Sequence, residues 1–207
     1  MKKLLISIIL LLVVFSSAVY SQEPDEKSVL KEEVTVSSSN LKFDNLSLQY
    51  ARLISGDLWL NLGVIDLSLS AHKNMPSMGD FVSKDGTFNG GLLLGIDKHK
   101  SLAPKLELIY GLNIIMYYSY INHTTDNPSI PAYARSITVN SFSPGVGVGL
   151  GVFYKINPSV LFGFEVNPSV SYSFINGRNP DGLPYKNRGI YFSINNEVAR
   201  VSLKYRF

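Results

Sequence analysis

The amino-acid sequence predicts an all-β fold: an antiparallel, up-and-down transmembrane β-barrel, with eight strands as the expected number. Apolar and polar residues alternate with a period of two over most of the chain after residue 57, which is the pattern of strands with two different faces. Short and long connections between these runs also alternate, as do the periplasmic turns and extracellular loops of membrane barrels. The polar faces are mostly Gly, Ser and Asn with few charges, which suits a narrow interior.

The composition excludes several other classes. The 207 residues are 45% hydrophobic and 17% charged, which is too apolar for a disordered chain. The chain has no cysteine, so disulfides, thiolate nucleophiles, cysteine-bound metal sites and anchoring through an N-terminal cysteine are excluded. Its formal net charge is +3, with two of the cations near the N-terminus. No basic patch predicts nucleic-acid binding.

Residues 1–21 have the pattern of a secretory signal peptide. Lys2 and Lys3 precede an apolar run over residues 4–15, and small residues follow up to Ser21, where we place the cut. The apolar run is shorter than the ~20 residues that a membrane-spanning helix needs.

Eight strands are expected in the rest of the chain. Six are clear, over residues 58–70, 88–97, 105–120, 137–154, 160–174 and 188–207. An acidic leader, residues 22–40, supplies a candidate first strand at its end, and residues 41–54 supply a second. This reaches the eight strands at which bacterial single-chain barrels start, and it places the barrel at residues 41–207. Residues 41–54 alternate poorly, so a periplasmic tail is the alternative there.

Two parity changes indicate bulges, because a one-residue slip exchanges the two faces of a strand. One lies near Ile65 and the other at residues 195–196. The last run is therefore expected to be a single bulged strand and not a hairpin.

Aromatic side chains gather at the two ends of the predicted strands. Tyr117, Tyr118, Tyr120, Tyr172 and Phe174 fall beside the long connections, and Tyr154, Phe162 and Tyr205 beside the short ones. Rings with one polar edge favour the headgroup level, so two belts about 25 Å apart predict the girdles of an outer-membrane barrel. The alternative, a secreted soluble β-barrel or sandwich, has no reason to sort its aromatics in this way.

The final residues alternate and end in an aromatic ring. Val201, Leu203, Tyr205 and Phe207 are separated by polar residues, and this pattern resembles the signal by which the barrel-assembly machinery recognises bacterial outer-membrane barrels. The chain resembles a small outer-membrane barrel of the OmpA/OmpX type, in the form common in Bacteroidota and without a peptidoglycan-binding domain. The resemblance implies a location in the bacterial outer membrane, both termini in the periplasm, contact with outer-membrane lipid, and contact with the assembly machinery during biogenesis.

Four charged residues predict a network in the lumen. Glu107, Glu165, Arg200 and Lys204 fall on inward faces, and buried charges persist only when they are paired. We expect the two acids to pair with Arg200, Lys204 or both. Such a network is either a proton or ion path or, as we favour, a structural plug. The glycines at positions 145, 147, 149 and 151 alternate along a strand, which indicates interior positions and not a phosphate-binding loop.

No set of residues predicts catalysis, a cofactor or a metal site. His123 falls in a long connection, where a lipid-acting site would lie, but it departs from the lipid A deacylase pattern because Thr125 stands where that pattern has serine. His99 falls in a predicted periplasmic turn and is expected to be solvated. His72 begins a long connection without metal-ligand spacing.

We therefore expect a non-enzymatic barrel with a lumen filled by side chains. It would act as a structural or interaction protein, or as a subunit of an envelope assembly, through extracellular loops that contact an envelope protein. Two alternatives stay open: a barrel enzyme that modifies outer-membrane lipid through His123, and a small pore for solutes or ions.

Overall fold

The computed structural model describes residues 30–39, 45–74, 81–132, 135–178, 183–193 and 199–207. Residues 31–207 form one compact unit. The expected signal peptide, the first part of the leader and the bulge expected at residues 195–196 lie outside the described residues. In the part of the chain that is described, no helix is long and apolar enough to cross a membrane.

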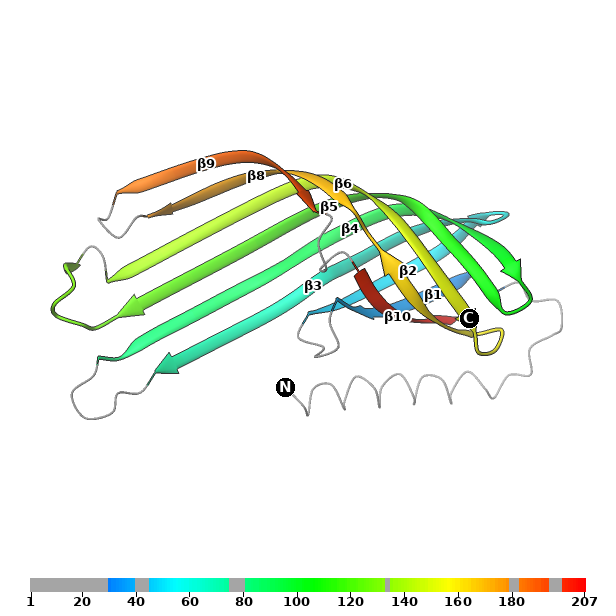
Figure 1. Cartoon of the computed structure of the whole chain (residues 1–207), viewed down its shortest axis with the longest axis horizontal. Coiled ribbons are helices and arrows are strands. Elements are labelled where there is room, and N and C mark those ends of the chain that lie inside the picture. The colour runs from blue at the N-terminus through cyan, green and yellow to red at the C-terminus, as the bar shows by residue number, and fades with distance from the viewer. Residues whose placement is uncertain (1–29, 40–44, 75–80, 133–134, 179–182, 194–198) are drawn as a thin grey trace. The chain divides into compact units, whose positions relative to one another are not determined.

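The described residues form ten antiparallel strands, which Figure 1 labels in chain order. They are β1 (Glu32–Ser38), β2 (Leu46–Ser55), β3 (Leu58–Asn74), β4 (Ser83–Ala103), β5 (Leu106–Thr125), β6 (Ser136–Lys155), β7 (Val160–Val166), β8 (Ser169–Arg178), β9 (Pro184–Ser193) and β10 (Ala199–Arg206). Below, the end of the strands beside the short connections 56–57 and 104–105 is called the turn end, and the opposite end is called the loop end.

Eight strand positions close into a ring. β1 to β6 pair in chain order, β6 pairs with β7, β7 with β10, and β10 with β1. β7 and β8 are two parts of one strand position, because both pair with β6, β7 toward the turn end and β8 toward the loop end. β9 and β10 lie opposite them in the same order. The predicted antiparallel barrel of eight strands is confirmed, and in the described part of the last run β9 and β10 pair with β8 and β7 and not with each other.

The break between β7 and β8 has a local cause. Asn167 and Pro168 separate the two strands, and proline has no N–H to donate to a ladder. The carbonyl of Pro168 still accepts a hydrogen bond from Val148 N at 2.9 Å. This bond holds the broken strand position against β6.

The bulge predicted near Ile65 is confirmed. The register between β3 and β4 shifts between Ile65 and Ser68, and Asp66 adopts a φ of 51°, in the left-handed region that residues other than glycine rarely occupy. Its N–H donates to Ser47 Oγ at 2.9 Å. The side chain of the same residue becomes part of the lumen network described below.

The register of the ring determines its tilt and width. One row of directly paired residues passes once around the ring and returns to the strand on which it began. The row is Leu106, Tyr154, Phe162, Leu203, Val36, Leu48, Val64, Leu92 and Met116. It returns to β5 ten residues beyond its start, so the shear number is ten. Strands of such a barrel tilt by about 40°, and an eight-stranded interior is just wide enough for side chains to fill.

The two faces of the ring differ in chemistry. Two apolar clusters and many polar side chains lie inside; the clusters are Ile65, Leu93 and Ile115 with Tyr117, and Ile109, Phe153 and Leu161. Outside, large apolar side chains are exposed, including Leu112 at 70% and Phe164 at 64%. The ring is therefore inverted relative to a water-soluble barrel, because its largest continuous apolar surface faces outward.

Beyond the ring, toward the loop end, the sheet is open. Past Leu67, β3 pairs with β4 alone, and β9 pairs with β8 alone among the described residues. Figure 1 shows β3, β4, β5, β6, β8 and β9 extending well past β1, β2 and β10. Residues 68–74 and β9 form the two edges of this extension.

Several strands are longer than the sequence predicted. β4 includes residues 98–103, which were expected to form a turn, and β3, β4 and β5 extend into the expected connections 71–87 and 121–136. These segments are polar on both faces, so their pairing leaves no apolar alternation to detect. The ring also begins at β1, ahead of residue 41, and the periplasmic-tail alternative for residues 41–54 is wrong because β2 is part of the ring.

Candidate functional site in the barrel lumen

A buried charge network at the turn end of the lumen joins the first and last strands of the ring. Lys204 Nζ on β10 lies 3.1 Å from Glu33 Oε1 on β1 and 3.8 Å from Glu165 Oε1 on β7. Arg206 Nε donates to Glu33 Oε2 at 2.8 Å, and its guanidinium also bonds Glu107 on β5. Glu33, Glu107 and Lys204 are buried, so each of these charges depends on its partners.

Glu107 is the most heavily partnered carboxylate of the network. Lys155 Nζ lies 2.9 Å from its Oε2, Arg206 Nη1 donates to the same oxygen at 3.0 Å, and His99 Nδ1 lies 3.1 Å from its Oε1. The ring of His99 stacks on Trp59 with centroids 4.7 Å apart. This stacking holds the imidazole beside the carboxylate.

The expectation that His99 is solvated is wrong. Its side chain is only 7% exposed, because β4 continues past Lys98 and turns this residue toward the lumen. The alternation that places Asp97 inside continues through His99, and this was the sequence signal that could have found it.

The expected pairing of Glu107 also needs correction. Its partners are Arg206, Lys155 and His99 and not Arg200 or Lys204, whereas Glu165 does lie beside Lys204. Arg200 is buried elsewhere on β10.

Arg200 pairs with the residue at the bulge of β3. Its Nη2 donates to Asp66 Oδ2 at 2.7 Å. A bulge residue has no predictable face before its local geometry is known, so the alternation could not assign this partner. Glu33 was missed for a different reason, since it lies in the segment that was interpreted as a leader.

The closed part of the lumen holds little free space. A cavity in it measures about 20 Å³, roughly what one water molecule needs, and is lined in part by Gln49, Asp97, Asn113, Glu165 and Phe153. Backbone and side chains approach closely around it: a Cβ added at Gly111 would collide with the Asp97 carboxylate and the Ile96 carbonyl. Side chains and their charges therefore occupy the width of the ring.

The glycines of β6 are interior positions, as predicted. A Cβ added at Gly145 would lie 2.5 Å from the carbonyl oxygen of Val170, and one added at Gly151 would lie 2.7 Å from Phe153 Cε2. Both distances are shorter than real side chains show. Glycine is needed here so that the neighbouring strand and a lumen ring can approach.

Toward the loop end, the same inward face becomes a wall of small polar side chains. Ser119 Oγ donates to Asn89 Oδ1 at 2.6 Å, and Asn89 Nδ2 donates to Ser68 Oγ at 3.4 Å, so one chain of hydrogen bonds crosses β5, β4 and β3. Ser143 Oγ donates to Ser173 Oγ at 2.8 Å between β6 and β8. The bonds satisfy the side chains locally.

His123 lies on a strand and not in a loop, contrary to the prediction. It is part of β5, and its Nδ1 contacts Asp85 Oδ1 on β4. Among the described residues, no hydroxyl is hydrogen-bonded to this imidazole. His72 on β3 is the cross-strand neighbour of Asp85. In the described part of the chain, no group of three or more metal-ligating side chains is placed to hold an ion.

Most of the aromatic residues expected in belts face outward. Tyr118, Tyr154, Phe162, Tyr172 and Phe174 are exposed on the outer face. Tyr120 has the same parity as Tyr118 on β5, and Tyr205 stacks on Phe207 with centroids 5.9 Å apart. Tyr117 is the exception: it packs inside against the Ile65 cluster, because its parity is that of Ile115.

The C-terminal residues of the expected insertion signal lie at the closure of the ring. Leu203 and Phe207 are exposed at 45% and 41%, while Ser202 and Lys204, on either side of Leu203, are buried. The carbonyl of Phe207 accepts hydrogen bonds from Lys31 N at 3.2 Å and Glu32 N at 3.0 Å. The alternation that resembles the signal thus also separates the outer face of β10 from its lumen face.

Comparison with solved structures finds bacterial outer-membrane proteins. A major outer membrane protein of Thermus thermophilus superposes with a TM-score of 0.49 at 17% identity, over 86% of this chain and 98% of that one. CarO of Acinetobacter baumannii superposes with a TM-score of 0.40 at 9% identity, over 88% and 100%. Ail, the attachment invasion locus protein of Yersinia pestis, does so with a TM-score of 0.38 at 10% identity, over 86% and 94%. No family model and no curated protein matches the sequence.

The register and the faces of the ring decide the architecture. The chain is a small eight-stranded β-barrel with an apolar outer face and a lumen that holds paired charges, polar side chains and two apolar clusters. In this barrel most of the buried charges lie at the turn end, Arg200 is buried beside the bulge of β3, and the open polar sheet lies at the loop end.

Proposed function

We propose that this chain is an integral outer-membrane β-barrel protein with a filled lumen, which acts as a structural or interaction protein. The outer face of β5 carries the proposal. Its outward residues from Leu106 to Tyr120 are all apolar or aromatic, without a charge. At a tilt of about 40° a strand rises about 2.5 Å per residue along the barrel axis, so Tyr110 and Tyr120 are about 25 Å apart in height. That is the height of the apolar band on outer-membrane barrels.

A lipid environment also accounts for the closed ring. Backbone N–H and C=O groups in hydrocarbon need partners, and only a sheet without edges supplies them all. A charge on the lipid face near the midplane would cost about 2–4 kcal/mol, which explains why the outward band is uncharged while the lumen is not. Short connections at the turn end, together with the first and last strands there, favour a periplasmic position for that end.

The filled lumen supports an interaction role over transport. The charges at the turn end pair with one another and the cavity beside them measures about 20 Å³, which favours a plug over a path for hydrated ions. The sheet and connections at the loop end are the surfaces that remain for binding, and surface loops on a rigid scaffold are the usual carriers of such function. An envelope protein is the partner class that we propose.

Gel mobility of the protein in an outer-membrane fraction, compared before and after boiling, tests the membrane barrel. We expect a heat-dependent shift, because a closed ring resists SDS until it is heated. Recovery from the soluble fraction with no shift would contradict the proposal and favour a secreted soluble barrel.

Conductance in planar bilayers separates the plug from a pore. We expect no single-channel steps from the wild type, because paired charges fill the lumen. Steps that disappear when Glu107 is changed to Gln would instead favour an ion path through this network.

The enzyme alternative rests on His123 and its contact with Asp85. We expect His123→Ala to leave the mass spectrum of lipid A unchanged, since no hydroxyl nucleophile bonds the imidazole among the described residues. A lipid A species that is lost in this variant and restored by the wild type would favour the enzyme.

A further inference from the structure

We propose that five outward-facing cations at the loop end, Lys73, Lys84, Arg178, Lys186 and Arg188, bind the phosphate groups of lipids in the outer leaflet of the membrane. We call this set the cation belt. The proposal rests on the membrane barrel proposed above and adds a defined lipid-binding surface to it.

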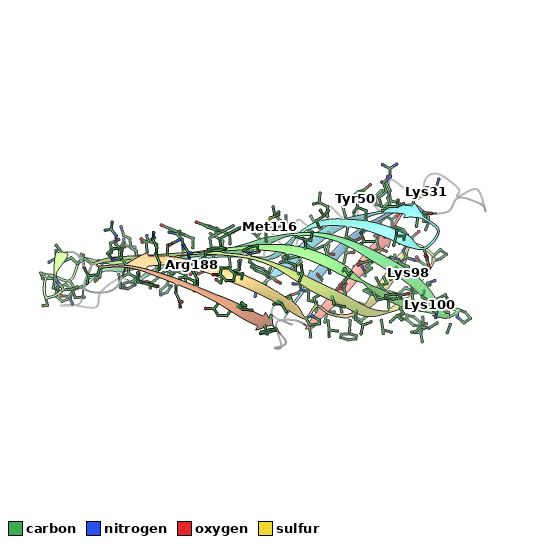
Figure 2. The ribbon with its side chains drawn as sticks, turned by 90° about the horizontal axis from the view of Figure 1, so that it is seen from above. Lys31, Tyr50, Lys98, Lys100, Met116 and Arg188 are labelled. Carbon is green, nitrogen blue, oxygen red and sulfur yellow. The ribbon has the colours of Figure 1, made fainter. Side chains whose placement is uncertain are left out.

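The cation belt follows from strand parity. Lys73 and Lys84 are outward residues of β3 and β4, while Arg178, Lys186 and Arg188 are outward residues of β8 and β9, and all five are exposed. These strands are the two sides of the open sheet described above. Figure 2 shows Arg188 well away from Lys98 and Lys100, which lie toward the opposite end of the sheet.

The barrel tilt places these cations at similar heights. The paired row climbs ten residues per circuit of eight strands, which is about 3 Å of height per strand. Tyr118, Phe142, Phe174 and Arg188 lie in one row of directly paired residues. The row crosses three strand pairs from Tyr118 to Arg188, so Arg188 lies about 9 Å closer to the loop end than Tyr118 along the barrel axis. Lys84 on β4 pairs with Thr124 on β5, six residues past Tyr118. Six residues raise the height by about 15 Å and the step back to β4 lowers it by about 3 Å, so Lys84 lies about 12 Å closer to the loop end than Tyr118. The belt therefore forms a layer just beyond the outer aromatic residues, at headgroup level.

Two lysines of the cation belt repel each other within the described strands. Lys73 and Lys84 lie directly opposite each other on adjacent strands, an arrangement of like charges that destabilises a sheet. The outward positions of the described strands at this end carry no carboxylate. An anion between the two lysines would remove the repulsion.

The turn end provides the contrast. There Lys98 Nζ lies 3.4 Å from Asp57 Oδ2, and Arg52 lies opposite Glu32 on the adjacent strand. Among the described residues, Lys98 and Arg52 on the outer face at the turn end thus have acidic neighbours, whereas Lys73 and Lys84 at the loop end face each other. This asymmetry favours an anionic partner supplied by the surroundings of the loop end.

A phosphate carried by a lipid fits this position better than free phosphate. Arginine binds phosphate through a planar fork and lysine as a compact point charge, and each basic side chain near an anionic membrane surface contributes about 1 kcal/mol of attraction. The guanidinium of Arg188 lies 5.9 Å from the centroid of the Phe174 ring, so the belt directly adjoins the apolar band. A lipid contacts both layers at once, whereas a free ion contacts only the cations.

Lipid titration followed by native mass spectrometry tests the proposal. The protein is folded in neutral detergent and titrated with bisphosphorylated lipid A. The test variant is Lys73→Gln/Lys84→Gln/Lys186→Gln/Arg188→Gln, and the matched control is Arg52→Gln/Lys98→Gln/Lys100→Gln/Lys105→Gln at the turn end. We expect at least about tenfold weaker binding by the test variant, wild-type binding by the control, and weak binding of dephosphorylated lipid A to all three proteins.

Three results would overturn the cation belt: equal binding by the test variant and the wild type, equal binding of dephosphorylated lipid A, or displacement of lipid A by an equal concentration of inorganic phosphate. If the test variant does not fold, the wild type alone decides, because its lipid A binding must weaken steeply between 50 mM and about 500 mM salt. A heat shift on gels with no phosphate-dependent binding defeats the cation belt alone. Loss of the heat shift in the wild type defeats the membrane barrel as well.

Discussion

At the scale of single residues, Lys204 illustrates how the lumen tolerates charge. Its ammonium is buried between Glu33 and Glu165 and lies 4.8 Å from the centroid of the Phe153 ring. Removing one member of such a group lowers the free energy of unfolding by more than the contact itself contributes, because the carboxylates left behind stay buried without this partner.

We expect Lys204→Met to destabilise the folded barrel by about 3–5 kcal/mol. Urea unfolding in lipid vesicles measures it. Lys98→Met is the control, since its ion pair with Asp57 is half exposed and such pairs contribute about 0–1 kcal/mol. Equal losses in the two variants would show that the lumen network is not what holds the ring together.

Two glycines within strands should respond differently to alanine. A Cβ at Gly111 would collide with the Asp97 carboxylate and the backbone of β4, whereas a Cβ at Gly86 meets nothing within 4 Å. We expect Gly111→Ala to lower the free energy of unfolding by about 1–3 kcal/mol through overpacking, and Gly86→Ala to change it little. The midpoint of the heat-dependent gel shift reports both. A tolerated Gly111→Ala would mean that the ring is wider than its register indicates.

At the scale of elements, strands were predictable wherever one face is apolar. β5 and β6 alternate over their length inside the apolar band, and the slip at Ile65 marked the bulge of β3 correctly. Beyond the band both faces are polar, so the ends of β3 and β4 were interpreted as loops. The first strand was weak for a related reason: its inward residues include Glu33 and Thr35, which resemble an acidic leader until their partners on β10 are known.

The outward band can be tested with one pair of substitutions. Ile114 and Leu102 are exposed to the same degree, 55% and 54%, but Ile114 lies mid-strand and Leu102 lies at the turn end. In a bilayer we expect Ile114→Arg to cost about 2–4 kcal/mol and Leu102→Arg about 0–1 kcal/mol, measured by folding into lipid vesicles. A soluble barrel would tolerate both changes equally, because both sites would face water.

At the scale of the whole molecule, the register with which β1 and β10 close the ring cannot be inferred from the sequence of any one strand. The sequence predicted eight strands, but the shear of ten depends on how β1 meets β10, and pairing between segments far apart in the chain has no local signal. For the same reason Arg206 was missed as a partner of Glu107, although its parity matches that of Lys204. Four charges of the candidate site were predictable from parity, and of their pairs only Glu165 with Lys204.

Engineered cysteines can verify this register, because the chain has none of its own. Val36 is paired directly with Leu203, so we expect Val36→Cys/Leu203→Cys to form an intramolecular disulfide on oxidation, seen as a mobility change on non-reducing gels. Val36→Cys/Phe207→Cys, displaced by four residues along the partner, should not. Cross-linking of the second pair alone would mean a different shear and a different lumen.

The pairing of β1 with β10 also determines when the ring can be completed during folding. Every other seam of the ring joins neighbours in the chain or strands within its second half, whereas this seam must bring together residues separated by most of the sequence. The entropy of closing so long a segment is lost before the contacts form. The seam should therefore be the last to form. Until it forms, Glu33 and Lys204 lie on the two unpaired edge strands of an open sheet, and each charge lacks the other as the partner that it has in the closed ring.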